Sequence, residues 1–272
     1  MRGQNRVATF ARAANSECRL ITWNFEQEST LYALLITIWR FLLRLLWRGL
    51  QIMLAFVLLT SAAVLFHRFH NPAPSALMVD WRHTLAARGQ PERPLQQAWV
   101  AYEAIAAPLK LAVVTAEDQK FPVHHGFDLE AIDKAWVGNQ QGKTLRGAST
   151  ISMQVAKNVY LWPGRSWLRK GLEAWFTLLL ETFWSKQRIL EVYLNVAQFD
   201  TRTFGAEAAA QQFFNKPAAR LNRAEAALLA AVLPAPTVYR VEAPSAYIRQ
   251  RQFWILWQMR LLGDDYLAGL GE

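Results

Sequence analysis

Apolar residues follow two patterns along the chain, one continuous and one periodic. Residues 49–66 form an uninterrupted run of 18 residues without a charge, which just meets the length needed to cross a bilayer. From about residue 108 onward, apolar positions recur every three or four residues, and few segments alternate with a period of two. The patterns predict a single transmembrane helix over residues 49–67, followed by a mainly α-helical domain.

The periodic part divides into separate helices at polar and proline-containing breaks. Ser149 is a reasonable N-cap for one helix, and Asn222 with Glu225 three residues later has the pattern of a capping box. Pro234 and Pro236 end the helix that this box begins. The predicted helices cover residues 109–116, 129–137, 150–161, 168–184, 186–196, 205–214, 224–232 and 247–262.

Charges around the apolar run predict its orientation. Arg40, Arg44 and Arg48 precede it at a spacing of four residues and form one basic stripe on a continuing juxtamembrane helix. The positive side of a membrane helix stays in the cytoplasm, so residues 1–48 should be a basic cytoplasmic arm. A cleaved signal peptide is less favoured, because the run starts late and the small residues 61–63 lie within it.

The segment after the anchor is rich in helix breakers. Prolines and a glycine interrupt residues 71–94, which predicts a linker or pedestal over residues 68–107 with one short helix. The helical domain should then occupy residues 108–262, and residues 263–272 should form a C-terminal tail.

Composition limits the classes of partner. A chain of 272 residues allows one sizeable domain with an appendage, or two small domains. Its net charge of +9 is too small a bias for a dedicated nucleic-acid binder but suits anionic lipid or phosphate-bearing ligands. The single cysteine, Cys18, excludes an intramolecular disulfide and a cysteine-based zinc site. The twelve tryptophans, many of them near apolar runs, fit interfacial anchoring.

Ionisable side chains are concentrated directly after the apolar run 109–116. Glu117 ends that predicted helix, and partial desolvation there should raise its pKa towards the range useful for proton transfer. Asp118, His124 and Asp128 lie close by in the sequence. The alternative is an ordinary helix end with a solvated polar turn. For His124 and Asp128, we favour a role in holding the turn over tuning the proton affinity of Glu117.

A second cluster lies at the start of the next predicted helix. Ser149 and Thr150 introduce a helix whose free backbone N–H groups make a natural site for phosphate or sugar oxygens. Gln154 and Lys157 follow on a similar face, which adds an amide and an ammonium group to the hydroxyl. The alternative is a capped helix with a polar outer face.

A third cluster places cations before a carboxylate. Arg165, Arg169 and Lys170 precede Glu173, which stands four residues after Arg169 and three after Lys170. The apolar run 174–180 follows, and the combination suits a ligand with a phosphate head and a lipid tail. The alternatives are a surface salt bridge within a helix and a buried core helix.

A fourth segment covers residues 189–195 and ends in Tyr193 and Asn195. Its aliphatic positions suit a core helix. We favour a structural role, in which Tyr193 and Asn195 tie a helix end to its neighbours.

Together and in this order, the segments resemble glycosyltransferase family 51 of the peptidoglycan polymerases, in particular its monofunctional transglycosylases. The resemblance covers about residues 111–262, and because the chain ends soon after the last motif we expect no downstream penicillin-binding domain. The matching positions are Glu117, Asp118, Phe121, His124 and Gly126; Ser149, Thr150, Gln154, Lys157 and Asn158; Arg169, Lys170 and Glu173; residues 189–195; and residues 204–210 with 213–217.

The chain departs from the family pattern at two places. It has Gly147-Ala148 and Met153-Gln154 where the family usually carries Gly-Gly and Gln-Gln, and Gln198-Phe199-Asp200 where an acidic residue and then a glycine are usual. Both glutamates and the phosphate-facing cations are spared. The departures therefore concern the positioning of sugar or lipid, and the rate, more than the class of reaction.

The resemblance implies a lysozyme-like, mainly α-helical fold and polymerisation of lipid II, the undecaprenyl-pyrophosphoryl disaccharide-pentapeptide. Glu117 would be the general base, and inversion in one displacement would need no glycosyl-enzyme nucleophile. Glu173 would act on the donor side through neighbouring cations or a divalent metal, Mg²⁺ or Mn²⁺. The expected substrate- and phosphate-binding residues are Ser149, Thr150, Gln154, Lys157, Asn158, Arg165, Arg169 and Lys170, with Asp118, Phe121, His124, Gly126, Tyr193 and Asn195 as supporting residues.

The expected partners and location follow from the same resemblance. The partners are lipid II, the growing glycan chain, membrane lipid and other proteins of cell-wall synthesis or division, with no nucleic acid. The chain should cross the inner membrane once, with its N-terminus cytoplasmic and its catalytic domain periplasmic. Two alternatives remain: a lytic or hydrolytic lysozyme-like enzyme, and a non-catalytic scaffold of the cell-wall machinery.

Overall fold

The computed structural model describes residues 4–270 except residues 73, 91–93, 141–148 and 165, and gives the backbone alone for residues 4–33, 136 and 138–140. Contacts divide the chain into two compact units, Met1–Leu59 and Thr60–Glu272. The two units are described separately.

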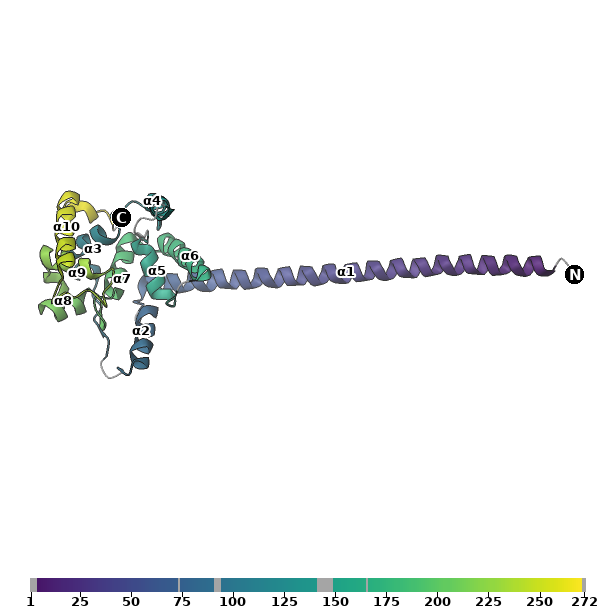
Figure 1. Cartoon of the computed structure of the whole chain (residues 1–272), viewed down its shortest axis with the longest axis horizontal. Coiled ribbons are helices and arrows are strands. Elements are labelled where there is room, and N and C mark those ends of the chain that lie inside the picture. Colours follow the sequence, from purple (N-terminus) through teal and green to yellow (C-terminus); the bar gives the residue numbers. More distant parts are fainter. Residues whose placement is uncertain (1–3, 73, 91–93, 141–148, 165, 271–272) are drawn as a thin grey trace. The chain divides into compact units, whose positions relative to one another are not determined.

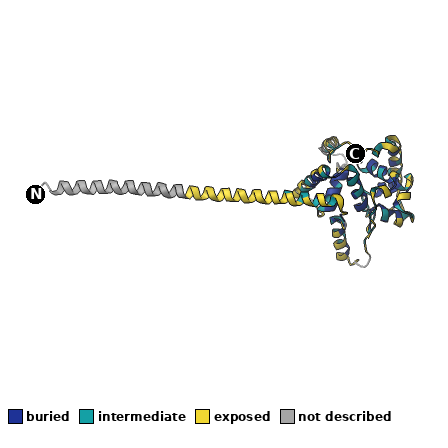
Figure 2. Ribbon diagram, turned by 180° about the vertical axis from the view of Figure 1, so that it is seen from behind, coloured by how far each residue is buried: buried dark blue, intermediate teal, exposed yellow. Residues whose placement is uncertain are grey.

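The first unit is the greater part of one long helix, α1 (Gln4–Phe69). Its segment Leu34–Phe69 is long and apolar enough to cross a membrane, with a mean hydropathy of 2.2 and almost no burial. Figure 2 shows residues 34–56 of this helix as exposed. A helix of 36 residues is about 54 Å long, against about 30 Å of hydrocarbon. The charge-free run 49–66 alone is about 27 Å long, so Arg40, Arg44 and Arg48 fall in the part that exceeds the hydrocarbon core.

The second unit is mainly α-helical, as predicted, and Figure 1 shows its helices gathered around a common centre. A short parallel pair, β1 (Gln96–Gln97) and β2 (Thr203–Phe204), places Gln96 beside Thr203. The helices are α2 (Ala76–Ala87), α3 (Ala107–Glu117), α4 (Leu129–Gln140), α5 (Ile151–Tyr160), α6 (Trp167–Phe183), α7 (Lys186–Val196), α8 (Ala206–Phe214), α9 (Arg223–Val232) and α10 (Ala246–Leu262), with 3₁₀ turns at Tyr102–Ala104, Ala218–Arg220 and Asp264–Leu267.

The core is built from two groups of helices. Helix α3 packs against α9 and α10, while α5 packs against α6 and α7. Helix α9 is buried along almost its whole length and is rich in alanine, and such small residues let neighbouring helices approach closely. Helix α3 buries Leu109 and the run Leu111–Thr115. This burial on all sides fixes the end of α3, where Glu117 stands.

Most helix boundaries fall within two residues of the prediction, and one cap differs. The predicted capping box of α9 is present, since Asn222 accepts from the backbone N–H of Glu225 while the Glu225 side chain accepts from Asn222. The predicted cap of α5 is wrong by one residue. Thr150, not Ser149, accepts from the backbone N–H of Met153. Both hydroxyl residues can cap a helix, and the choice depends on where the chain turns.

The last turns of α1 belong to the second unit and are tied to α6 and α7. The indole N–H groups of Trp175 and Trp184 donate to the Thr60 hydroxyl (3.1 Å) and the Val64 carbonyl (2.8 Å). Arg188 of α7 donates to the carbonyl of His67 at 3.0 Å. The last turns of α1 are therefore tied to α6, which carries Arg169 and Lys170, and to α7.

Candidate functional site

Glu117 is the last residue of α3, and its side chain is 13% exposed. Its Oε2 accepts a hydrogen bond from the Gln154 amide of α5 at 3.0 Å. Its Oε1 lies 3.7 Å from a guanidinium nitrogen of Arg251 on α10. Three helices therefore meet at this carboxylate, and each of its oxygens faces a polar group.

Burial raises the pKa of the Glu117 carboxyl above its ordinary value. The hydrogen bond from Gln154 and the charges of Arg251 and Lys157 oppose that rise without cancelling it. The predicted cause, desolvation at the end of an apolar helix, is thus the main one. A carboxylate with a raised pKa is a better proton acceptor than a solvated one.

A cleft of about 390 Å³ is lined in part by Gln154, the hydrogen-bond donor to this carboxylate. The α5 residues Gln154, Lys157 and Asn158 line it together, and a common face was predicted for Gln154 and Lys157. Arg169 of α6 and Tyr193 of α7 add further polar groups, and the Tyr193 hydroxyl donates to Gln154 at 3.4 Å. The remaining lining residues are Leu77, Leu161, Trp162, Pro163, Gly164, Ala197, Gln198, Leu233, Pro234 and Pro236.

Lys157 lies within the electrostatic field of both glutamates. Burial lowers the pKa of its ammonium group, while the negative charges of Glu173 and Glu117 raise it. The cations Arg169 and Lys170 lower it further. The lysine thus connects the carboxylate at the end of α3 with the cationic cluster of α6.

Glu173 is a buried ion-pair partner. Its side chain is 5% exposed, and its oxygens lie 2.8 Å from the Lys170 ammonium and 3.4 Å from the Arg169 guanidinium. The alternative of a surface salt bridge is therefore wrong, because the carboxylate is enclosed. The alternative of a core helix holds for one face of α6, where Phe176, Thr177, Leu179 and Leu180 are buried.

Asp118, next to Glu117, belongs to a different network. It accepts from the backbone N–H of Ile151 and from His124 Nε2, both at 2.9 Å. The Nδ1 of His124 in turn accepts from the backbone N–H of Gly126 at 3.0 Å, which fixes the histidine as its Nε2–H form. The Thr150 hydroxyl donates to the Gly126 carbonyl at 2.7 Å. We call Asp118, His124, Gly126 and Thr150 the turn network.

The turn network needs glycine at position 126. Gly126 has a φ of +88°, and an added Cβ would lie 2.8 Å from the Thr177 Cγ2 of α6. Asp128 accepts from the backbone N–H of Ala131 at 3.0 Å and so caps the start of α4. These contacts agree with the turn role that we favoured for His124 and Asp128.

The other motif residues hold elements together. Phe121 is fully buried in the core. The Asn195 side chain bonds both the N–H and the carbonyl of Val100 at 2.9 Å, which ties the end of α7 to the segment before α3. That is the structural role favoured for Asn195, whereas Tyr193 also reaches the cleft. Ser149 is exposed, and Arg165 lies outside the described residues.

Arg251 is the site residue that the motifs did not reveal. It contacts Glu117 from α10, and its guanidinium also donates to the Ala116 carbonyl at 3.4 Å. A sequence signal for it exists, since Arg251 falls on the same helical face as the buried Ile248, Ile255 and Met259. A charge on a core-facing stripe usually has a buried partner.

Several buried donors around the cleft lack a partner within the described part of the chain. They include Arg169 Nε, Gln198 Nε2 and Arg251 Nε. Buried polar groups are normally hydrogen-bonded, so unmatched donors at a cleft indicate a polar, oxygen-rich ligand.

The donor set does not fit a divalent cation held by the protein alone. No group of three or more His, Cys, Asp or Glu side chains is placed to hold a metal among the residues with described side chains. Glu173 is a single carboxylate that already faces Lys170 and Arg169. Hard cations need several oxygen ligands, and two neighbouring ammonium and guanidinium groups repel them.

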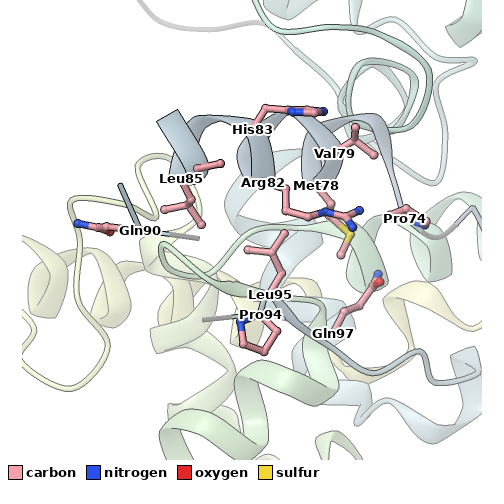
Figure 3. Close-up of a pocket in the computed structure, with 11 residues that line it drawn as sticks. Pro74, Met78, Val79, Arg82, His83, Leu85, Gln90, Pro94, Leu95 and Gln97 are labelled. Carbon is pink, nitrogen blue, oxygen red and sulfur yellow. The ribbon is translucent and has the colours of Figure 1, made fainter. Parts of the chain in front are cut away.

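A larger cavity, of about 880 Å³, lies on the other side of α2. Figure 3 shows the α2 residues Met78, Arg82, His83 and Leu85 among its lining residues, with Leu95 from the segment after α2. Leu77 of α2 lines the cleft, so this helix separates the two cavities. No carboxylate lines either cavity among the described residues, but the smaller cleft is lined by Gln154 and Arg169, the partners of Glu117 and Glu173. We therefore place the candidate site at the smaller cleft.

The chain is similar to known proteins over most of its length. The model of the family described as transglycosylase matches residues 83–260. A protein of Xanthomonas oryzae named biosynthetic peptidoglycan transglycosylase is 54% identical over 220 residues, covering 79% of this chain and 90% of the relative. Proteins of the same name from Pseudomonas aeruginosa (51% identity, 84% and 99% covered) and Pasteurella multocida (50% identity, 86% and 94% covered) are similar.

Proposed function

The chain belongs to the transglycosylase family, and from this premise we propose that it is a membrane-anchored peptidoglycan glycosyltransferase that polymerises lipid II into glycan strands. Its relatives are named for biosynthetic peptidoglycan transglycosylation. Its mainly α-helical second unit is the lysozyme-like domain of the family.

One observation carries the proposal: a largely buried carboxylate with a raised pKa stands near a cleft lined by partly buried cations. Glu117 is the proposed general base, which takes the proton from the 4-hydroxyl of the acceptor sugar as that oxygen attacks the anomeric carbon of the donor. Gln154 and Arg251 hold its two oxygens. This fixes the direction in which the carboxylate meets the hydroxyl.

The cations of α5 and α6 are the proposed binding site of the departing pyrophosphate. Lys157 and Arg169 line the cleft, and Lys170 stands next to Arg169. Fixed cations in a water-poor site stabilise negative charge that develops in the transition state. The unmatched Nε of Arg169 is a donor available to a phosphate oxygen.

Inversion at the anomeric carbon is the proposed stereochemical course. An α-linked donor and a β-linked product require one displacement, for which no second carboxylate nucleophile is needed. Glu173 suits a supporting part in such a reaction. Its two cationic partners hold it as a buried carboxylate, so it positions Lys170 and Arg169 rather than attacking the sugar.

Anchoring in the inner membrane, with the second unit in the periplasm, is supported by three features. The Leu34–Phe69 segment is long and apolar enough to span a bilayer. The arginine stripe precedes the charge-free run, so the N-terminal side is expected in the cytoplasm. On α6, Trp167 and Leu168 are 93% and 70% exposed, beside the proposed pyrophosphate site. Such residues suit contact with the membrane surface where a lipid-linked substrate lies.

A polymerisation assay tests the proposal. Purified full-length protein in detergent is incubated with lipid II, and glycan length is followed on gels. The unmodified chain and a Glu130→Gln control, which changes an exposed carboxylate of α4, should extend glycan. Glu117→Gln should not. Chain growth by a folded Glu117→Gln variant would remove Glu117 as the base.

The same assay distinguishes glycan synthesis from the lytic alternative. A lysozyme-like hydrolase would shorten finished glycan and leave lipid II monomeric, whereas a synthase lengthens the product. A folded, unmodified chain without either activity would instead favour the scaffold interpretation.

A further inference from the structure

Gln198 is a polar side chain of the cleft to which the proposed reaction gives no role. It lines the cleft together with Lys157 and Arg169, and it is partly buried. Its Nε2 is enclosed and lacks a hydrogen-bond partner within the described part of the chain. A buried amide donor without an acceptor destabilises the fold, so an unmatched donor at a cleft is typical of a ligand contact.

The backbone around Gln198 is held in place without help from this side chain. Residue 198 forms a bridge with Phe204. Next to that bridge, the backbone N–H of Gly205 donates to the Ala197 carbonyl at 2.8 Å. The Asp200 carboxylate closes the intervening turn by accepting two backbone N–H groups at 2.6 Å. The side chain of Gln198 is therefore positioned by its loop and left free for another task.

The amide of Gln198 can turn towards a ligand at little cost. The terminal torsion of a glutamine side chain is broad, so the amide plane rotates without leaving a preferred rotamer. That plane carries two N–H donors and a carbonyl acceptor. Gln198 can therefore donate to a ligand group and accept from the same group.

The position of Gln198 favours an uncharged ligand group over a phosphate. Positive charge enters the cleft from α5 and α6, through Lys157 and Arg169. Gln198 instead directly follows Ala197, the C-cap of α7, and the C-terminus of a helix carries a partial negative charge. A phosphate is therefore drawn to the two cations, and the amide is left for a neutral part of the ligand.

An acetamido group matches the chemistry of Gln198 and of the apolar lining. It has a carbonyl oxygen that accepts, an N–H that donates, and a methyl group that gains from apolar contact. A sugar hydroxyl would also bond the amide but would leave the apolar lining uncovered. The apolar residues that line the cleft beyond α5 and its following loop are Leu77, Ala197, Leu233, Pro234 and Pro236.

We propose that Gln198 binds the 2-acetamido group of the sugar that carries the pyrophosphate, and so selects an N-acetylated hexosamine as donor. The inference rests on the proposed glycosyltransferase function and adds a specificity-determining residue to it. Nε2 donates to the acetamido oxygen, and Oε1 accepts from the acetamido N–H. With the pyrophosphate at Lys157 and Arg169, this contact holds the sugar at the carbon next to the reacting one.

A cycle of two proteins and two donors tests the contact. Full-length protein in detergent is given lipid II, or an analogue with a 2-hydroxyl in place of the 2-acetamido group on the sugar that carries the pyrophosphate. Gln198→Leu should lower kcat/KM about ten-fold on lipid II and less than about two-fold on the analogue, because only lipid II loses a partner. Equal losses on both donors, or no loss on lipid II, would overturn the proposal.

Two further variants control for size and for folding. Gln198→Glu keeps the length of the side chain but cannot donate, so it should lose the preference for lipid II as Gln198→Leu does. Gln212→Leu changes an exposed glutamine of α8 and should keep the preference. The melting temperature of Gln198→Leu should not fall. A clear fall, with parallel losses on both donors, would make Gln198 structural.

Binding measurements separate the sugar from the phosphate. In a Glu117→Gln background, affinities are measured for lipid II and for undecaprenyl pyrophosphate, which has no sugar. Gln198→Leu should weaken the binding of lipid II about five-fold and leave that of undecaprenyl pyrophosphate unchanged. Lys157→Met should weaken both. An equal loss of affinity for the two ligands in Gln198→Leu would assign Gln198 to the phosphate and overturn the proposal.

Failure of the proposed function gives a different result from failure of this contact. A folded, unmodified chain that does not extend lipid II would remove the function and the inference together. A chain that extends lipid II, and whose preference between the two donors survives Gln198→Leu, would remove the inference alone.

Discussion

Glu117 and Asp118 are adjacent in the chain, yet the two carboxylates belong to regions that differ in how completely their polar groups are hydrogen-bonded. In the cleft, Glu117 has one amide hydrogen bond and a guanidinium at 3.7 Å, and burial raises its pKa. In the turn network, Asp118 accepts a backbone N–H and a histidine N–H, both at 2.9 Å. The cleft retains unmatched donors such as Arg169 Nε, while the turn network forms a closed set of hydrogen bonds.

One motif therefore supplies both a proposed catalytic residue, Glu117, and a residue that holds the structure, Asp118. The oxygens of Asp118 are occupied by hydrogen bonds within the protein, so this carboxylate holds structure and is not free to meet a substrate hydroxyl. A buried carboxylate with few partners gains a proton more readily and can exchange it with a substrate. The turn network holds the segment after α3 against the start of α5, and so it sets the distance from Glu117 to Gln154 and Lys157.

The largest expected effect is on catalysis by Glu117→Gln. Loss of a general base should lower kcat by about 10³-fold, within the 10²–10⁴-fold range typical of proton transfer by a positioned side chain. The amide keeps the shape of the site and a partner for Gln154, so thermal stability at neutral pH should not fall. Initial rates of lipid II consumption and the melting temperature by circular dichroism measure the two effects separately.

The distinction between a catalytic Glu117 and a structural Asp118 would fail if Glu117→Gln unfolded the protein. A melting temperature lowered by Glu117→Gln as much as by a substitution in the turn network would mean that Glu117 is structural. The Glu130→Gln control should leave both quantities unchanged, since Glu130 is exposed on α4.

The opposite outcome is expected for Asp118→Ala. This change leaves the backbone N–H of Ile151 and the Nε2–H of His124 buried without an acceptor, at a cost of about 3 kcal/mol. Thermal unfolding in detergent should show a drop of roughly 10 °C. The exposed Asp133→Ala on α4 is the matched control and should shift the melting temperature by less than about 2 °C.

Periodicity predicted the helices well, because their packing is dictated by apolar faces. Helix α7 begins and ends at the predicted residues, and the α9 capping box forms as its Asn and Glu spacing indicated. The cap of α5 differed because Ser149 and Thr150 are chemically equivalent as caps, and Thr150 is selected by its hydrogen bond to Gly126. That bond joins residues 24 positions apart in the chain.

The site was predicted only as far as its residues lie in local motifs. Glu117, Gln154 and Lys157 come together because α3 and α5 meet, and their motifs already named them. Arg251 stands 134 residues after Glu117, and only the packing of α10 on α3 brings the two together. The sequence marks Arg251 as a charge on a buried face but does not name its partner.

Arg251→Met should change the pKa of the proposed base, Glu117, without removing its carboxylate. The guanidinium lowers the pKa of Glu117, so its loss should raise that pKa further. The acid limb of the kcat/KM profile should move to higher pH, with rates reduced severalfold on the acid side and nearly unchanged at alkaline pH. Arg260→Met on the exposed face of α10 is the control. A uniform loss at every pH would instead show that Arg251 binds substrate.

The smallest expected effect is on the pH dependence of stability. Because burial raises the folded-state pKa of Glu117 above its unfolded value, the neutral carboxyl favours the folded state, and that contribution is lost as pH rises through the folded pKa. Glutamine stays neutral throughout. The melting temperature of Glu117→Gln should therefore equal that of the unmodified chain in acid, below the ordinary glutamate pKa, and exceed it progressively towards neutral pH. A difference that shrank with rising pH would mean that Gln154 and Arg251 stabilise the ionised form of Glu117 outright.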